Sequence, residues 1–168
     1  MKVRACQRLD EAYLGTTWRP QLRANPRRPV VLADMRQLPF RDCSFHEVTH
    51  VWCLYHLDGP RAAIAEARRV LEPDGVYFAA TSGRDNDPEI MPEGYPGSTF
   101  DAEEAEDIVG VVFDSAVAER WDAQFFALET REEVRAYCRH KFIPLERADI
   151  AKVPLWLTMR GALVRARK

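Results

Sequence analysis

Two polar side chains follow predicted strands, and their types suit chemistry at the edge of a sheet. Asp34 follows the apolar run at residues 29–33, and His56 follows the β-forming run at residues 45–54. A carboxylate accepts hydrogen bonds from amino groups, and an imidazole can accept a proton from a substrate hydroxyl or amine. Each residue also has a purely structural interpretation, Asp34 as a turn or cap residue and His56 as a helix-initiating residue.

Two further pairs of residues match functional motifs by spacing alone. His46 and His50 are expected to share one face of a strand, but no third ligand lies nearby in the sequence, so no metal site is predicted. Tyr137 and Lys141 match the Y-x-x-x-K pair of short-chain dehydrogenases. Because the apolar face of a predicted helix contains Tyr137, and no dinucleotide fingerprint accompanies the pair, we interpret it as a chance match.

The residues around His56 form a predicted β-α-β unit. Residues 45–54 and 76–81 are predicted strands, and residues 60–71 between them are a predicted helix with proline in its first turn. Such a unit pairs its strands in parallel through a right-handed crossover. The sequence therefore predicts an α/β fold.

A third predicted strand, at residues 29–33, brings Asp34 to the same place. Its residues do not alternate, so we expect it to be buried on both faces. The carboxyl ends of parallel strands meet at one edge of a sheet, where open α/β sheets bind ligands. Asp34, residues 51–56 and residues 81–84 are expected to gather at that edge.

The rest of the chain completes one predicted domain spanning residues 1–168. Two capping boxes, Asp101 with Glu104 and Thr130 with Glu133, are expected to begin helices. Predicted strands at residues 117–128 and 161–167 follow these helices. Residues 1–29 match no clear element, so residues 30–168 are taken as the core of the domain.

Three segments in this order carry a resemblance to a known family. They read L-A-D-M with L-P-F and D-C-S-F, then L-Y-H-L, then A-R-R-V-L-E-P-D-G-V, within residues 32–76. The succession is similar to that of class I S-adenosylmethionine-dependent methyltransferases that act on small molecules. The resemblance implies a Rossmann-like, mostly parallel sheet with helices on both faces and an antiparallel last strand. It further implies S-adenosylmethionine as the cofactor and a small-molecule O, N or C nucleophile as the methyl acceptor.

The resemblance also implies roles for single residues. Asp34 would accept a hydrogen bond from the adenine amino group, and Met35 would contact the adenine ring, unless its side chain belongs to the core. Val51 would line the methionine part of the cofactor, and His56 would be the catalytic base. Two positions depart from the family pattern: His46 stands in place of an aspartate, and Tyr55 in place of a histidine.

The glycine-rich loop of this family is missing from the sequence. G-x-G occurs nowhere, and Gly15 is the one glycine before Gly59. We therefore expect an N-terminally truncated domain that starts to resemble the family at Val30 and binds the cofactor weakly on its own. Asp10 is a candidate ribose-binding acid. The alternatives to an active enzyme are a non-catalytic remnant or partner subunit, or a gene fragment of a longer methyltransferase.

Composition limits the partners of this chain. The net charge of −2 gives no pull toward nucleic acid, and no apolar run is long enough to cross a membrane. The four cysteines are far apart and are interpreted as reduced thiols of a cytoplasmic protein. The family order predicts a strand beside Val48, Val51 and Trp52 for which the sequence has no segment. Either the predicted strands at residues 30–33 and 48–54 pair directly, or an exposed edge there pairs with a second copy or a partner chain.

Overall fold

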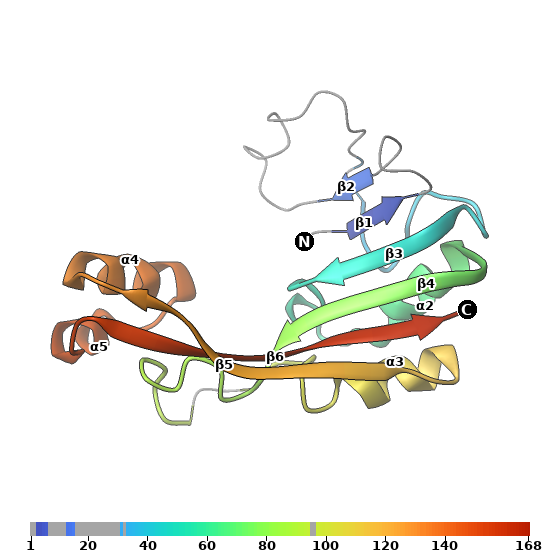
Figure 1. Ribbon diagram of the computed structural model, residues 1–168. Coiled ribbons are helices and arrows are strands. Elements are labelled where there is room, and N and C mark those ends of the chain that lie inside the picture. Colours follow the sequence, from blue (N-terminus) through green and yellow to red (C-terminus); the bar gives the residue numbers. More distant parts are fainter. Residues whose placement is uncertain (1–2, 7–12, 16–30, 32, 95–96) are drawn as a thin grey trace.

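The computed structural model describes residues 3–6, 13–15, 31, 33–94 and 97–168 (Figure 1). Most of the strand predicted at residues 29–33 lies outside these ranges, as does Asp10. Within them, Ala33 has no strand assignment, and Asp34 forms an isolated antiparallel bridge with Gln37.

The described strands form one mixed sheet in the order β2-β1-β3-β4-β6-β5. Their bounds are Val3–Cys6 for β1, Tyr13–Gly15 for β2, Phe45–Val51 for β3, Leu71–Ser82 for β4, Val117–Leu128 for β5 and Leu155–Arg167 for β6. Strands β3 and β4 are parallel, because helix α2 (Arg61–Val70) carries the chain back between them. The predicted β-α-β unit and the antiparallel last strand are both present.

The sheet contains less parallel pairing than the sequence predicts. Of the pairings among the described strands, β1–β2, β1–β3, β4–β6 and β5–β6 are antiparallel. The prediction of an exposed edge at Val48, Val51 and Trp52 is wrong for β3 itself. Strand β1 pairs along it, from Val3 opposite His50 to Cys6 opposite Glu47. The edge strands of the described sheet are β2 and β5.

Helices α2 and α3 (Ala105–Phe113) pack on the same face of the sheet. Alternate residues of β4 turn toward these helices. Tyr77 and Ala79 are fully buried there, and the Tyr77 ring stacks on Phe113 with 4.9 Å between centroids. One core therefore joins the parallel pair to both helices.

Strands β5 and β6 extend beyond this core as a long hairpin that ends in helices α4 (Arg131–Lys141) and α5 (Leu145–Ile150) (Figure 1). We call residues 121–160 the arm. A second cluster fills it, made of Ile90, Val134, Cys138, Ile143, Ala148 and Leu157. The capping box of Thr130 and Glu133 begins α4 as predicted. The box predicted for Asp101 and Glu104 does not form, because Asp101 accepts hydrogen bonds from Ser98 and Arg84 instead.

Candidate functional site

The carboxyl ends of β3 and β4 lie side by side, as predicted. Val51 pairs with Ala80, and the Trp52 amide donates to the Ala80 carbonyl at 2.9 Å. Trp52 has a φ of +47°. This left-handed conformation is rare for an aromatic residue, and residues held in such conformations cluster at functional sites. Its side chain is 47% exposed, so the indole is accessible to solvent at this edge of the sheet.

A short 3-10 helix, η1 (Leu54–His56), follows and places two aromatic rings at the same edge. The rings of Tyr55 and His56 lie 4.4 Å apart. His56 is exposed, and partial burial lowers the pKa of its imidazole. The neutral form, which can accept a proton, is therefore favoured at neutral pH. His56 is also the last residue of η1, so its structural and chemical interpretations are compatible.

Asp34 lies in a tight turn with its carboxylate exposed. Arg36 donates to both carboxylate oxygens from its side chain, at 2.7–3.1 Å, and its amide donates to Oδ1 at 2.9 Å. These bonds lower the pKa of Asp34 to about 2, so the carboxylate is ionised at neutral pH. The spacing of Asp34 and Arg36 in the sequence is the signal that could have predicted this pair.

Arg36 and Met35, both in the Asp34 turn, have different surroundings. The pKa of Arg36 is raised mainly by its hydrogen bond to Asp34, and also by the charge of Asp58, which comes two residues after η1. Met35 and Leu54 meet in the main core, where Met35 is 1% exposed. The side chain of Met35 is therefore part of the core, one of the two roles considered for it from the sequence. Val51, the last residue of β3, is half-buried.

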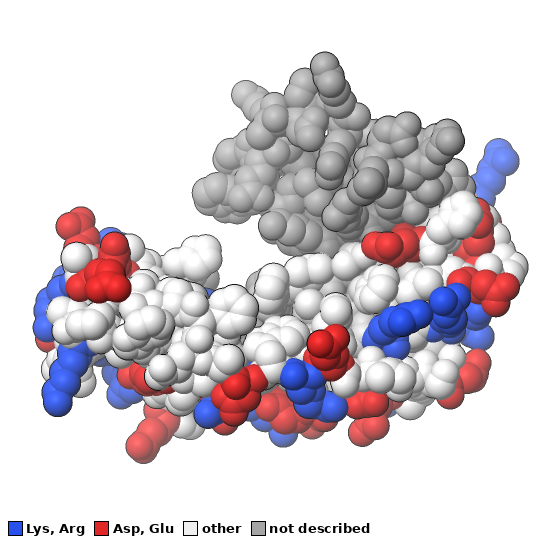
Figure 2. Space-filling model, in the orientation of Figure 1, with Lys and Arg blue, Asp and Glu red and all other residues white. Residues whose placement is uncertain are grey.

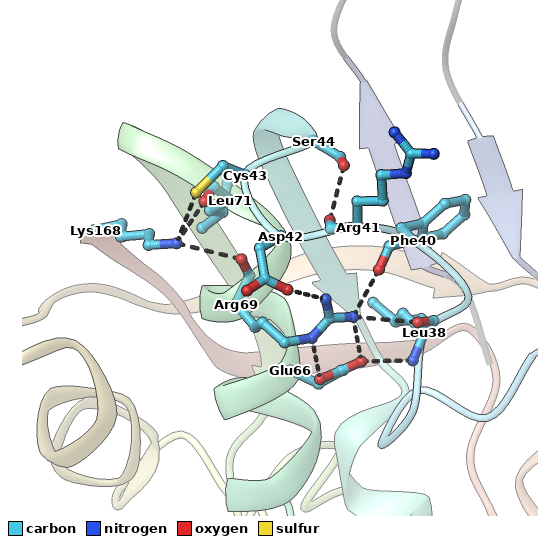
Figure 3. Close-up of polar contacts among 10 residues, drawn as sticks. All are labelled: Leu38, Phe40, Arg41, Asp42, Cys43, Ser44, Glu66, Arg69, Leu71 and Lys168. Carbon is cyan, nitrogen blue, oxygen red and sulfur yellow. Dashed lines mark hydrogen bonds and ion pairs between the residues drawn. The ribbon is translucent and has the colours of Figure 1, made fainter.

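Arg69 of α2 fixes the loop that leads from this turn to β3 (Figure 3). Its guanidinium bonds the carboxylate of Glu66 at 2.7–2.8 Å and that of Asp42 at 2.5 Å, and donates to the carbonyls of Leu38 and Phe40. Glu66 in turn accepts from the Leu38 amide at 2.8 Å. The L-P-F, D-C-S-F and R-R-V-L segments of the sequence are therefore parts of one hydrogen-bonded structure.

A cavity of about 250 Å³ opens after the end of β4, next to Gly83 and Ala102. Arg160 crosses its wall, bonding Asp85 at 2.7 Å and Asp122 at 3.0 Å. The indole of Trp121 packs on Gly161, where a Cβ atom would lie 2.3 Å from the ring. The cavity combines charged groups with an aromatic wall beyond the end of β4, and no motif in the sequence predicted it.

The two remaining motif pairs have structural roles. His46 and His50, which are expected to share a strand face, have different surroundings. His46 is exposed and pairs with Glu72, whereas His50 is buried, and its Nδ1 lies 2.8 Å from the hydroxyl of Tyr77. Burial lowers the pKa of His50 to about 4. Among the described residues, no three His, Cys, Asp or Glu side chains group as metal ligands.

Tyr137 and Lys141 lie on α4, away from the edge described above. The Tyr137 hydroxyl donates to the buried carboxylate of Asp87 at 2.6 Å, and Lys141 lies 3.7 Å from the same oxygen. Burial, and then the hydrogen bond to Asp87, raise the pKa of Tyr137 well above its ordinary value. A phenol that holds its proton this firmly is unsuited to act as a dehydrogenase acid near neutral pH.

Charged side chains of both signs lie on the described surface. Figure 2 shows acidic and basic side chains interspersed over the described surface in view, without a continuous basic face. No helix among the described residues is long and apolar enough to traverse a lipid bilayer.

A family model described as "Methyltransferase domain" matches residues 8–79. The match confirms the resemblance predicted from the sequence, and it begins upstream of Val30, so the prediction that the resemblance starts there is wrong. No curated protein matches the chain.

Solved structures share the fold at low sequence identity. YcgJ of Bacillus subtilis is 14% identical, with 95% of this chain and 82% of that chain covered and a TM-score of 0.61. The [4+2]-cyclase SpnF is 17% identical (88% and 60% covered, TM-score 0.53), and MccD is 14% identical (88% and 71% covered, TM-score 0.53). Identities this low show the α/β fold alone. The family match, placed in that fold, supports S-adenosylmethionine-dependent methyl transfer, with S-adenosylmethionine as the cofactor.

Proposed function

We propose that this chain, whose methyltransferase domain lies in an α/β fold, transfers the methyl group of S-adenosylmethionine to an O, N or C nucleophile of a small molecule. The observation that carries the proposal is that the carboxyl ends of the parallel strands β3 and β4 lie side by side, where open α/β sheets bind ligands. The cofactor supplies an electrophilic methyl group on a sulfonium. The protein's part is to orient both reactants and to exclude water.

Asp34 fits the adenine end of the cofactor. Its carboxylate is exposed and ionised, so it can accept a hydrogen bond from an exocyclic amino group in addition to those from Arg36. Because the Met35 side chain is buried, a contact of this residue with adenine would come from its backbone. Val51, half-buried at the end of β3, would line the methionine part. Within residues 33–94 and 97–168 no glycine-rich turn is present to hold the methionine carboxylate.

His56 fits a base for the acceptor. It is exposed at the end of η1, and its lowered pKa keeps it neutral at physiological pH. We place the acceptor between His56 and the cavity lined by Gly83, Trp121 and Arg160, which follows the end of β4. The cysteine pattern supports a cytoplasmic location for this reaction.

The test is calorimetric titration of the full chain with S-adenosylmethionine and S-adenosylhomocysteine. We expect weak binding that Asp34→Ala weakens further, by about 10-fold to 100-fold, because one or two hydrogen bonds to a charged group are lost. Asp107→Ala, which changes an exposed aspartate on α3, is the matched control and should leave binding unchanged. Binding that is indifferent to Asp34→Ala would remove the adenine site from this edge.

The competing function is that of a non-catalytic partner subunit, which the absence of G-x-G favours. The two are separated by a second measurement on the same samples. Release of S-adenosylhomocysteine in the presence of a panel of small amines, phenols and carboxylates indicates an enzyme, and its loss in His56→Gln assigns the base. Binding of S-adenosylmethionine without release of S-adenosylhomocysteine in any of these mixtures supports the function of a partner subunit.

A further inference from the structure

Strand β5 is a long edge strand with one side unpaired in the described sheet. It pairs with β6 along its length and forms the lower edge of the sheet in Figure 1. Most of its residues are exposed, including Val117 and Phe125 at 70% each. Free backbone amides and carbonyls along such an edge are a template for another strand.

Strand β5 lacks two of the protections that edge strands commonly carry. It contains no lysine and no proline, and its bulge comes late, between Gln124 and Phe126. The stretch from Val117 to Gln124 is therefore regular enough to pair, and Phe125 is the extra residue of the bulge. The charges of the polar side chains of β5 then determine which strand can pair with it.

The charges of β5 select a second copy of the same strand in one register. In an antiparallel pair with two-fold symmetry, a residue faces itself at the centre, and its neighbours cross over. A centre at Glu119, Arg120 or Asp122 would oppose two like charges. A centre at Ala118 or Ala123 opposes no charges of opposite sign, whereas a centre at Trp121 places Arg120 opposite Asp122 of the second copy, twice.

This register extends ion pairs that each copy already has. Within one copy, Arg120 bonds Glu106 of α3 at 3.0 Å, and Asp122 bonds Arg160 of β6 at 3.0 Å. Across the centre, Arg120 would meet Asp122 of the second copy, so charges of alternating sign would run from one copy into the other. At the two ends, exposed Val117 would lie against exposed Phe125 of the second copy.

We propose that two copies of this chain associate through β5, in antiparallel register centred on Trp121, to form one continuous sheet. The pairing edge borders the cavity beside β4, because Arg120, Trp121 and Asp122 also line that cavity. The proposal is independent of the reaction assigned above.

The test is sedimentation of the full chain over a range of concentrations, with variants at the two ends of the pairing. Val117→Glu and Phe125→Lys each place one charge against an apolar side chain, and each should weaken association at least about tenfold. The double variant places Glu against Lys at both ends and should recover association to within about threefold of the parent chain. Both residues are exposed in the single chain, so these changes spare its core.

Two matched controls carry the same chemical changes elsewhere on the surface. Val111→Glu on α3 and Phe142→Lys after α4 alter side chains that are 65% and 90% exposed, and neither should affect association. A chain that stays monomeric at its highest attainable concentration would refute the proposal. So would a dimer that the β5 variants leave intact, a double variant that does not recover, or controls that weaken association equally.

Discussion

Replacing Arg69 by methionine should destabilise the protein far more than the same change at its neighbour Arg68. Methionine keeps most of the length and apolar stem of arginine but removes its charge and donors. In Arg69→Met, the carbonyls of Leu38 and Phe40 lose a donor, and the carboxylates of Glu66 and Asp42 lose their cation. The loop between the Asp34 turn and β3 would then be held by fewer bonds.

The magnitude follows from how exposed these groups are. The Arg69 side chain is 32% exposed and that of Glu66 14%, so the pair is partly screened by water. Hydrogen bonds to charged groups contribute about 1.5–3 kcal/mol each when buried and much less when exposed. We expect a loss of about 2–4 kcal/mol in the free energy of unfolding, or about 4–16 °C in Tm for a domain of this size.

The assay is thermal and urea unfolding followed by circular dichroism, with Arg68→Met as the control. Arg68 makes one bond, at 3.3 Å, to Asp114, whose side chain is 85% exposed, so its loss should cost no more than about 0.5 kcal/mol. Equal losses in the two variants, or no loss in Arg69→Met, would refute the role given to this residue. Arg69→Met should also weaken cofactor binding more than Arg68→Met does, because the loop it holds leads directly from Asp34.

Three further predictions test the fold. The pKa of buried His50 falls from about 6.5 to about 4 when the chain folds, so the stability of the fold should be full above pH 6.5 and decline as the pH falls to 4. Urea unfolding of the parent chain should show this decline, and in His50→Phe most of the decline should be absent. Gly161→Ala should lower Tm by several degrees, because the new Cβ would lie 2.3 Å from the Trp121 ring and 2.5 Å from the Thr81 carbonyl oxygen; an unchanged Tm would mean that Trp121 does not pack there. Thr130→Ala should cost about 0.5–2 kcal/mol in thermal unfolding, whereas Thr130→Ser, which keeps the capping hydroxyl, should cost little.

The elements that sequence reasoning predicted well are those with strong local signals. Helix α2 and strand β5 have almost the predicted bounds, because apolar periodicity and the flanking turn residues define both locally. The capping box of Thr130 and Glu133 forms as predicted for the same reason. Local signals do not determine strand order. The edge that we expected at β3 is instead paired with β1.

The candidate site was predictable only in part. The motifs predicted that the ends of β3 and β4 meet, since a β-α-β unit brings parallel strands to one edge. They could not predict the left-handed backbone of Trp52, because no glycine, asparagine or aspartate marks that position. They missed the role of Arg69 as well, since its partners Asp42 and Leu38 are set by tertiary packing rather than by helical spacing.

The two hydrophobic clusters of this protein share no residue, and this has a consequence for how the sequence can change. The main cluster holds β3, β4, α2 and α3 together, whereas the second lies within the arm and the loop that docks on it. Effects of substitutions at distant sites without common partners add nearly independently. Mutations can therefore accumulate around the second cluster of the arm, which borders the cavity beside β4, with little effect on the main cluster. Divergence of acceptor preference in descendants of this chain would be concentrated in residues 121–160.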